Sequence, residues 1–514
     1  MMPPELIHRI GLFSSDSPSL FAFLEAFSPC KGVVGNLEAL LRLGQRHAPQ
    51  DLWPRLRFHC PPDAQDLLDI KLVLDYYNNI DIDGIFDLTW LIPALQDHPQ
   101  VVVHVLRQRR TGTKHAPLSW FESLESLNIQ SISVSHVSLL SLLPKLPSMS
   151  SLVSIQVLYY DRCNDAFFEA LFNSLPTSNI TSFSLSCNRY VYSEEDPELD
   201  LSRSMLLNLI CWIELNAITR LDLEYYVPED DTIELLPAFY QALASSKTLR
   251  HVSLGCQNLD LFQNQVFATP FSFETLALTS ENFNTENMKA LCTGLYNSTL
   301  TSLTLECSDI AMLCAWLPQS NLRFFSLVGA SIDSTTKMQI LCEALTQTPT
   351  LRHLRLGGCS GQNLFPTLAL YLPNTTIERL EMSYSIYSQA INVTGLLSSP
   401  RLQYVNLSGN HFTDVHAFQL AHDLKDNNNI CHLVLDENEL AETGLNALIQ
   451  SIEERKLPMN VLSVNSNPKL NHVVVSNLID TGANPYLRFL GLKQIYWADI
   501  YSSSAYMFYP SYMK

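Results

Sequence analysis

An internal repeat runs through most of the 514 residues and limits this chain to folds made of stacked copies of one unit. Each copy carries apolar residues at relative positions 1, 4 and 6, with a small or amide residue near position 9. The pattern is clearest at 180–188, 351–359, 402–410 and 430–438. Apolar residues at positions 4 and 6 alternate as in a short strand with one buried face. The residue near position 9 then turns the chain, and an Asn there can bond the backbone of the turn.

The copies follow one another at unequal steps. About fourteen are present, and most steps are roughly 28 residues long. The longest step is 38 residues (218 − 180) and includes the acidic stretch 193–200, which we predict to be a protruding loop. The shortest step is 22 residues (322 − 300), so this unit is predicted to lack a full helix. The copies begin at Leu124, Leu152, Ile180, Ile218, Leu249, Phe273, Leu300, Leu322, Leu351, Ile377, Leu402, Ile430, Met459 and Leu487.

Segments with helical spacing separate the predicted strands. Each carries apolar residues three and four positions apart, which is typical of a helix with one buried side. The clearest are 166–172, 288–295, 338–345, 417–424 and 445–452. A unit of one strand and one helix has an apolar side that only a neighbouring unit can cover. We therefore predict an α/β solenoid with a parallel sheet on one face and helices on the other.

This pattern resembles the leucine-rich repeat, and it covers about residues 120–492. Repeats near 28 residues with full helices are similar to the ribonuclease-inhibitor subtype and to the repeat half of F-box/leucine-rich-repeat proteins. The resemblance implies a horseshoe, with parallel strands on the concave face and helices on the convex face. We assign 121–492 to this leucine-rich-repeat solenoid.

Residues 1–54 do not fit the repeat and are predicted to form three short helices. Ser17-Pro18 is typical of a helix start, and Leu20, Phe23, Leu24 and Phe27 share one face of that helix. The run 2–10, Met-Pro-Pro-Glu-Leu-Ile-His-Arg-Ile, and the later Leu-Trp at 52–53 resemble an F-box. The third helix departs from that family, because its usual Cys and Trp-Arg residues are absent.

The F-box resemblance implies binding to a Skp-type adaptor through Pro3, Leu6, Ile7, Ile10 and Leu20. The repeats would then hold a protein substrate, as the substrate-recognition subunit of a cullin-RING (SCF-type) ubiquitin ligase. A second interpretation makes residues 1–54 a helical cap of a stand-alone binding scaffold or inhibitor, since an end repeat needs a cover. A third, minor interpretation is a small-GTPase regulator.

Two further segments flank the solenoid. Residues 55–120 are predicted to be a connecting segment and an irregular N-terminal cap, with a helix near 67–77 and a buried strand at 101–105. The basic run 107–110 is interpreted as a solvated edge or loop. Residues 493–514 are rich in Tyr and are predicted to be an aromatic C-terminal cap or tail.

The sequence offers no catalytic motif. It contains no phosphate-binding GxxxxGK[ST], no GxGxxG, no HExxH and no GxSxG, and its 12 cysteines show no paired CxxC spacing. Cys187, Cys256, Cys307 and Cys359 lie at or beside the turn position of their repeats and are predicted to pack as buried thiols. We therefore expect a binding protein that is not an enzyme, with no catalytic residues, no cofactor and no metal.

Charge and hydropathy narrow the choice of partners. The formal net charge is −19, whereas nucleic-acid binding needs clustered positive charge, so we expect no nucleic-acid partner. No apolar run approaches the roughly 20 residues that a membrane-spanning helix needs, and no secretory signal is visible. We expect a soluble cytoplasmic or nuclear protein with no membrane contact.

The strand residues between the inward positions are the candidate partner-binding residues on the concave face. Exposed Tyr and Arg side chains carry much of the binding energy in protein interfaces, and several occur here. The predicted contacts are Tyr225, Arg250, His251, Phe324, Arg352, Arg355, Tyr384 and Tyr404.

Overall fold

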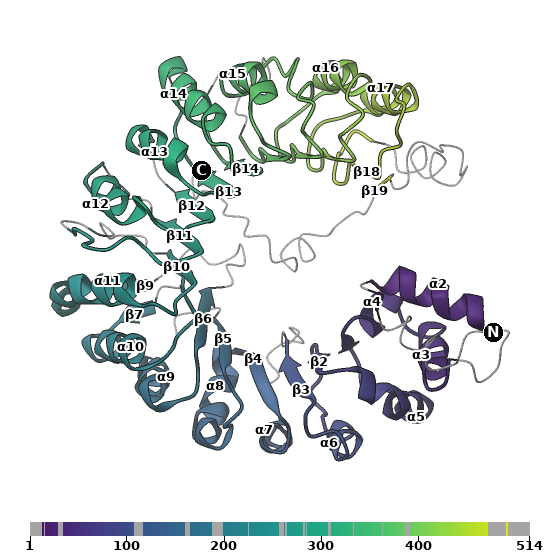
Figure 1. The fold of residues 1–514 in the computed structure, drawn as a ribbon, viewed down its shortest axis with the longest axis vertical. Helices are drawn as coiled ribbons and strands as arrows, with labels where there is room; N and C mark the ends of the chain where they lie inside the picture. The colour runs from purple at the N-terminus through teal and green to yellow at the C-terminus, as the bar shows by residue number, and fades with distance from the viewer. Residues whose placement is uncertain are drawn as a thin grey trace. The chain divides into compact units, whose positions relative to one another are not determined.

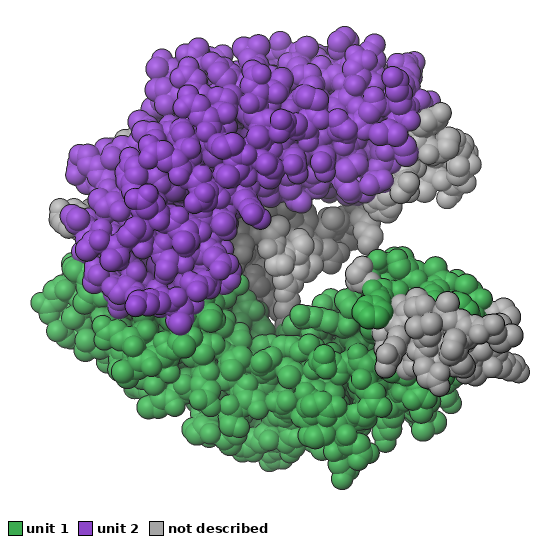
Figure 2. Space-filling view, in the orientation of Figure 1, with its two compact units in different colours: residues 1–239 green, residues 240–514 purple. Residues whose placement is uncertain are grey.

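The computed structural model describes residues 13–14, 16–28, 34–106, 117–159, 165–187, 199–224, 226–255, 262, 265–280, 283, 285–306, 310–332, 334–361, 363–385, 391–470 and 490–491. The chain divides into two compact units, residues 1–239 and residues 240–514 (Figure 2). The division falls inside helix α11 (Leu236–Ser245).

The first unit contains a parallel sheet in which each strand bonds to the preceding one. Its strands are β1 (Leu56–Phe58), β2 (Asn79–Ile82), β3 (Val102–Val105), β4 (Ile129–Ser135), β5 (Ser154–Tyr159), β6 (Ser182–Cys187) and β8 (Arg220–Leu223). Its helices beside the sheet are α5 (Ala64–Val73), α6 (Leu91–Leu95), α7 (Leu118–Glu125), α8 (His136–Leu142), α9 (Asp165–Ser174) and α10 (Arg203–Leu215).

The second unit repeats the same arrangement, and in Figure 1 its helices lie on one side of its strands. The parallel strands are β10 (His251–Gly255), β11 (Thr275–Thr279), β12 (Ser302–Glu306), β13 (Phe324–Val328), β14 (His353–Gly357), β15 (Arg379–Glu381), β16 (Tyr404–Asn406), β17 (His432–Val434), β18 (Val461–Ser463) and β19 (Leu490–Gly491). The helices are α12 (Thr285–Leu295), α13 (Ala311–Trp316), α14 (Thr335–Thr346), α15 (Leu364–Tyr371), α16 (Asp414–Leu424) and α17 (Glu442–Glu453).

Both units have the fold predicted from the repeat, a leucine-rich-repeat solenoid of parallel strands and helices. The apolar template positions form its core. Leu351, Leu354 and Leu356, at positions 1, 4 and 6 of one copy, have no exposed surface. The parallel register places Phe325 of β13 and Leu380 of β15 beside Leu354, so equivalent residues stack from copy to copy. Each fully buried Leu of this kind stabilises the fold by roughly 1.5–3 kcal/mol.

Buried amides fill the turn position in the last copies, as the template predicts. The Nδ2 group of Asn438 donates to the carbonyl oxygens of Leu407 and Leu435, both at 3.0 Å. Its Oδ1 accepts from the backbone N–H groups of Asn410 and Phe412, again at 3.0 Å. Each asparagine thereby connects its own turn to the turn of the preceding copy, which leaves few buried backbone groups without partners.

Cys359 occupies the turn position of its copy as a buried thiol, as predicted. It has no exposed surface, and burial raises the pKa of its thiol to about 12. The thiol therefore stays neutral and packs as a small apolar group. Cys256, Cys307 and the side chain of Cys187 lie outside the described residues.

The two unequal steps of the repeat have different structures. The short step contains α13, which has only six residues and continues as the 3-10 helix η5 (Leu317–Gln319), so the prediction of a truncated helix is confirmed. In the long step, β7 (Leu199–Leu201) pairs in parallel with β9 (Tyr226–Pro228). Residues 193–198 of the acidic stretch lie outside the described residues. The remaining 3-10 helices are η1 (Leu74–Tyr76), η2 (Leu143–Ser148), η3 (Leu175–Thr177), η4 (Asp230–Leu235) and η6 (Leu372–Asn374).

A further irregular copy lies between β15 and β16, where the described residues 391–403 form turns and no helix. Side chains of the next copy hold this loop. Asp423 Oδ2 accepts from the backbone N–H of Gly395 at 2.6 Å. Asn427 Nδ2 donates to the carbonyl oxygens of Leu397 and Ser399, both at 2.7 Å. These bonds replace the support that a packed helix would give.

The sheet of the first unit begins earlier in the sequence than the template indicates. Strand β3 confirms the buried strand predicted at 101–105, but β1 and β2 lie in a part of 55–120 for which no strand is predicted. Each of these strands has only two buried apolar residues in alternation, such as Ile80 and Ile82 in β2. Two alternating apolar residues also occur in many loops, so the repeat template does not distinguish these strands from a loop. The basic run 107–110 lies outside the described residues.

Within the described residues before the sheet, α2 (Ser17–Phe27) and α3 (Leu37–Gly44) confirm two of the three predicted helices, and the short α4 (Pro49–Leu52) was not predicted. The cap of α2 differs by one residue from the predicted Ser17. Asp16 is the N-cap, and its carboxylate accepts from the backbone N–H of Ser19 at 2.8 Å. A carboxylate caps as well as a hydroxyl and also interacts favourably with the helix dipole. Pro3, Leu6, Ile7 and Ile10 lie outside the described residues.

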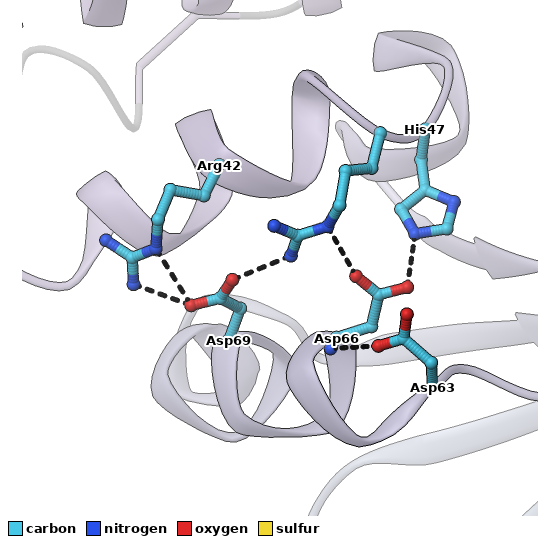
Figure 3. A network of polar contacts seen from close by, with 6 residues as sticks. Arg42, His47, Asp63, Asp66 and Asp69 are labelled. Carbon is cyan, nitrogen blue, oxygen red and sulfur yellow. Dashed lines mark hydrogen bonds and ion pairs between the residues drawn. The ribbon is translucent and has the colours of Figure 1, made fainter.

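A network of ion pairs attaches these helices to the first repeat (Figure 3). Asp69 of α5 accepts from Arg42 Nη2 at 2.6 Å and from Arg46 Nη2 at 2.7 Å. Asp66 of α5 accepts from Arg46 Nε and lies 2.7 Å from His47 Nε2. Burial opposes ionisation of Asp69, but Arg42 and Arg46 outweigh it and hold the pKa of this carboxyl below its usual range. The ion pairs therefore fix the C-terminal end of α3 to α5 of the first repeat.

Candidate functional site

Positions 3 and 5 of the repeat form the open face of the sheet in the second unit, which is the face away from its helices. Side chains alternate between the two faces of a strand, so these positions lie opposite the buried positions 4 and 6. The parallel register aligns them into two rows across β13 to β17. The first row is Phe324, His353, Arg379, Tyr404 and His432, and the second is Ser326, Arg355, Glu381, Asn406 and Val434.

Seven large side chains of these rows form the candidate site, which we name the arginine–aromatic patch. Its members are Phe324, His353, Arg355, Arg379, Glu381, Tyr404 and His432. Adjacent strands lie about 4.8 Å apart, so long side chains in the same row reach one another. The patch therefore extends over five strands.

Glu381 is the electrostatic centre of the patch. Its Oε1 lies 2.7 Å from Arg379 Nε and 3.0 Å from His353 Nε2, and its Oε2 lies 4.0 Å from Arg355 Nε. Only 15% of its side chain is exposed, and burial alone would disfavour the charged form. The interactions with His353 and Arg379 outweigh burial and lower the pKa of Glu381 to about 2. This carboxylate is therefore ionised at neutral pH and fixes the cations around it.

Aromatic rings lie on both sides of this charged centre. The rings of Phe324 and His353 meet edge to face, with centroids 4.5 Å apart. The guanidinium carbon of Arg379 lies 3.8 Å from the centre of the Tyr404 ring, and this ring lies 6.0 Å from that of His432. Burial raises the pKa of Tyr404, and the charge of Glu381 adds to that effect, so its hydroxyl stays protonated.

The patch has a positive balance within an acidic chain. With neutral histidines, Arg355 and Arg379 against Glu381 give 2 − 1 = +1, while the whole chain has 32 − 51 = −19. Arg379 keeps 46% of its side chain exposed, whereas Arg355 keeps 19%. The outer edge of the Arg379 guanidinium is therefore accessible to an incoming carboxylate, which it can bind through two parallel hydrogen bonds.

The arrangement is suited to recognition. Among the described residues, no group of three or more His, Cys, Asp and Glu side chains is placed to hold a metal ion. Within the same part of the chain, no helix is long and apolar enough to cross a membrane. A rigid surface with exposed arginine beside aromatic rings supplies the two residue kinds that contribute most at the centres of protein interfaces.

The structure separates the predicted partner-binding residues into three groups. Phe324, Arg355 and Tyr404 belong to the patch, and His251 lies in the same first row on β10, with Nδ1 3.1 Å from Thr275 Oγ1. Arg250 and Arg352 occupy position 2 and lie just before the strands. The Nε of Arg250 lies 3.5 Å from a carboxylate oxygen of Glu274, and that of Arg352 lies 3.3 Å from one of Glu378.

Two predicted tyrosines occupy position 8, beyond the strand. Tyr384 has a positive φ of 53°, and its hydroxyl bonds to the carboxylate of Glu437. It therefore lies on the turn side of the sheet, away from the two rows of the patch. Tyr225 lies outside the described residues. Leu20, the described member of the predicted adaptor contacts, has no exposed surface and packs inside the N-terminal helical segment.

His353, Arg379, Glu381 and His432 complete the patch. His353 and Glu381 are expected on the concave face from their places in the strands, whereas Arg379 and His432 were missed in the sequence. Arg379 and His432 are at position 3 of their copies, the same position as Phe324 and Tyr404. The register of the repeat was therefore sufficient to predict that Arg379 and His432 lie in this row.

Comparisons with known proteins bear on the fold. No protein-family model and no curated protein sequence matches the chain. An internalin from Listeria monocytogenes aligns over 78% of this chain and 94% of that chain, at 14% identity and a TM-score of 0.37. TLR13 in its complex with ssRNA13 aligns over 77% of this chain and 56% of the TLR13 chain, at 15% identity and a TM-score of 0.29. A chain of the Rad7 and Elc1 complex of yeast aligns over 72% of this chain and 77% of its own length, at 15% identity and a TM-score of 0.34. These likenesses are too low to assign a family or a function.

Proposed function

We propose that the chain is a protein-binding scaffold and that the arginine–aromatic patch binds an acidic, extended segment of a partner protein. The observation that supports this most is the fixed position of Arg379, held between Glu381 at 2.7 Å and the Tyr404 ring at 3.8 Å. An arginine already held in place loses little conformational freedom when it binds a carboxylate. The neighbouring rings supply apolar area beside that contact.

The charge balance supports an acidic partner. Glu381 neutralises one cation of the patch, which leaves one positive charge for the partner. A basic segment would meet that charge and would leave Arg379 without a new partner. An acidic segment with an aromatic or aliphatic residue would satisfy both the exposed guanidinium and the rings.

A selection from a random peptide display library against the full chain tests this proposal. We expect the selected peptides to be enriched in Asp and Glu next to apolar residues. A selected peptide should bind the full chain at least about tenfold more weakly after Arg379→Ala, which is a loss of about 1.4 kcal/mol. The matched control is Arg250→Ala, because Arg250 is a similarly exposed arginine outside the patch. Equal loss in both variants, or selection of basic peptides, would contradict the proposal.

We further propose that the chain is the substrate-recognition subunit of a cullin-RING ubiquitin ligase. This proposal rests on the resemblance of residues 2–10 and 52–53 to the F-box motif. In that role a Skp-type adaptor binds the N-terminal segment, and the patch holds a protein substrate. The contribution of the chain to the reaction is then proximity between the substrate and a ubiquitin-loaded enzyme.

The adaptor test needs the full chain, because α3 is attached to α5 of the first repeat through Arg42, Arg46 and Asp69. A co-purified Skp-type adaptor should be retained by the natural sequence and lost by the double variant Leu6→Ala, Ile7→Ala. Phe13→Ala is the control, since Phe13 is 87% exposed and lies just beyond the motif. If the natural sequence retains no adaptor, the chain is a stand-alone scaffold, and the peptide selection remains valid.

A further inference from the structure

Cys431 has an unusual polar environment at the edge of the arginine–aromatic patch. It occupies position 2 of its copy, directly before β17, and is half-buried. Its Sγ lies 3.1 Å from Nδ1 of His432 and 3.3 Å from the carbonyl oxygen of Gln403. An unprotonated ring nitrogen at this distance is placed to accept the proton of the thiol.

A buried cation is bonded to the backbone directly before this thiol. Arg455 follows α17, is 2% exposed, and donates from Nη2 to the carbonyl oxygen of Ile430 at 2.5 Å. Ile430 is the residue before Cys431, so the guanidinium lies beside the thiol-bearing residue. Within the described chain, Nε and Nη1 of Arg455 are buried and have no hydrogen-bond partner. Burial lowers the pKa of Arg455, and its attraction to Cys431 opposes that change.

These two neighbours perform complementary tasks in a reaction of the thiol. His432 takes up the proton, and Arg455 stabilises the negative charge that appears on sulfur. A buried guanidinium with unused donors is costly to the fold, so an anion beside it is favoured. Cysteines next to His and Arg side chains are typically the reactive ones in proteins.

We propose that Cys431 is a modification site that reacts with low-molecular-weight disulfides such as glutathione disulfide. Its sulfur attacks one sulfur of the disulfide, and the S–S bond of the reagent breaks as the new S–S bond forms. The leaving thiolate takes up the proton that His432 removed from Cys431. The reaction is an exchange, so the disulfide is the only oxidant required.

Four of the other described cysteines serve as comparisons. Cys292, Cys342 and Cys359 are buried, and burial raises the pKa of their thiols to about 11, about 12 and about 12. Cys60 is exposed, and so it is available as an internal reference for reaction without a built environment.

The test exposes the full, folded chain to glutathione disulfide at pH 7, blocks remaining thiols, and quantifies each adduct by peptide mass spectrometry. We expect the initial rate at Cys431 to exceed that at Cys60 at least about tenfold, which corresponds to about 1.4 kcal/mol in the barrier. Cys431→Ser should abolish the fast phase. Equal rates at Cys431 and Cys60 in the natural sequence would overturn the proposal.

Two variants separate the roles of the neighbours. His432→Phe keeps a ring beside Tyr404 but removes the base, and Arg455→Met removes the buried charge while keeping similar length. Each should slow Cys431 to near the rate of Cys60, while Arg250→Met, which removes an arginine away from Cys431, should leave it fast. If Arg455→Met fails to fold by circular dichroism, the half-buried His432 variant still decides, and an unchanged rate there refutes the dyad.

An adduct at Cys431 would lie at the β17 end of the patch, beside His432. Loss of peptide binding after glutathionylation would follow from this position, and that consequence rests on the proposed function. The labelling experiment needs no partner. A fast Cys431 in a chain that selects no acidic peptide would therefore support the modification site while contradicting the binding proposal.

Discussion

The guanidinium carbon of Arg379 lies 3.8 Å above the centre of the Tyr404 ring. The Nε of the same guanidinium donates to Glu381, whose Oε1 is 2.7 Å away. An arginine side chain on a protein surface can adopt many rotamers and is normally mobile. Here two neighbours hold it in one orientation, so this arginine can contribute to binding without first being ordered.

Replacing Arg379 with Met should separate binding from stability. We expect the affinity for a selected acidic peptide to fall at least about tenfold, because the exposed guanidinium is lost. The free energy of unfolding should change by less than about 1 kcal/mol, since exposed ion pairs and cation–π contacts are worth little. Fluorescence anisotropy and urea unfolding measure the two quantities. A large loss of stability would show that Arg379 serves the fold, and Arg250→Met provides the reference.

The contribution of Glu381 to stability should depend on pH. Its pKa is lowered from 4.5 to about 2, so its stabilisation is present above about pH 4.5 and is lost as the pH falls toward 2. Glu381→Gln cannot ionise, and it should be less stable than the natural chain at pH 7 by at most about 3 kcal/mol. Thermal unfolding at pH 7, 4.5 and 3 should show this difference shrinking. A constant difference would mean that Glu381 is not ionised against its neighbours.

Asn438→Ala should destabilise the second unit strongly. The change removes both the donor to Leu407 and Leu435 and the acceptor of the Asn410 and Phe412 N–H groups. Each buried backbone group left without a partner costs about 1–3 kcal/mol, so we expect a loss of about 3–5 kcal/mol in total. Urea unfolding followed by circular dichroism measures it. The control is Asn321→Ala, an exposed asparagine of the same unit, which should change stability by less than about 0.5 kcal/mol.

Asp69→Asn should loosen the N-terminal helices from the first repeat. The carboxylate is 2% exposed and is shared by Arg42 and Arg46, and an amide cannot accept from both with the same charge. We expect faster amide hydrogen exchange in α2 and α3, while β4 to β6 keep their protection. Asp75→Asn, whose carboxylate is 69% exposed, should leave exchange unchanged. Uniformly faster exchange across the first unit would instead indicate global destabilisation.

The repeat predicted the architecture because its spacing reflects packing. Leu354 and Leu356 must be buried for the copies to stack. The alternation of apolar and polar residues around them is therefore visible in the sequence and predicts the fold. The strands β1 and β2 were not predicted, because pairs of alternating apolar residues such as Ile80 and Ile82 are too short a signal. Likewise, Asp16 caps α2 in place of Ser17, since adjacent capping residues compete and local sequence does not rank them.

The site was predictable in position but not in detail. Position 3 of each copy marks Phe324, Arg379 and Tyr404 as neighbours in one row, and the repeat register alone is sufficient for that. Each long side chain can adopt many rotamers, and the rotamer of Arg379 depends on the half-buried carboxylate of Glu381, two positions further along the same strand. Tyr384 shows the reverse case, because a positive φ at position 8 turns it away from the row.

The positive balance of the patch within a chain of net charge −19 has a kinetic consequence. An acidic partner is repelled by the molecule at long distance and attracted only where it meets the arginines. Repulsion over more than about 10 Å is screened by ordinary salt, whereas a contact pair is screened less. Added salt should therefore accelerate association and, at higher concentration, accelerate dissociation as well. The patch would then select partners by the orientation of their approach, because most encounters with the acidic surface end before contact.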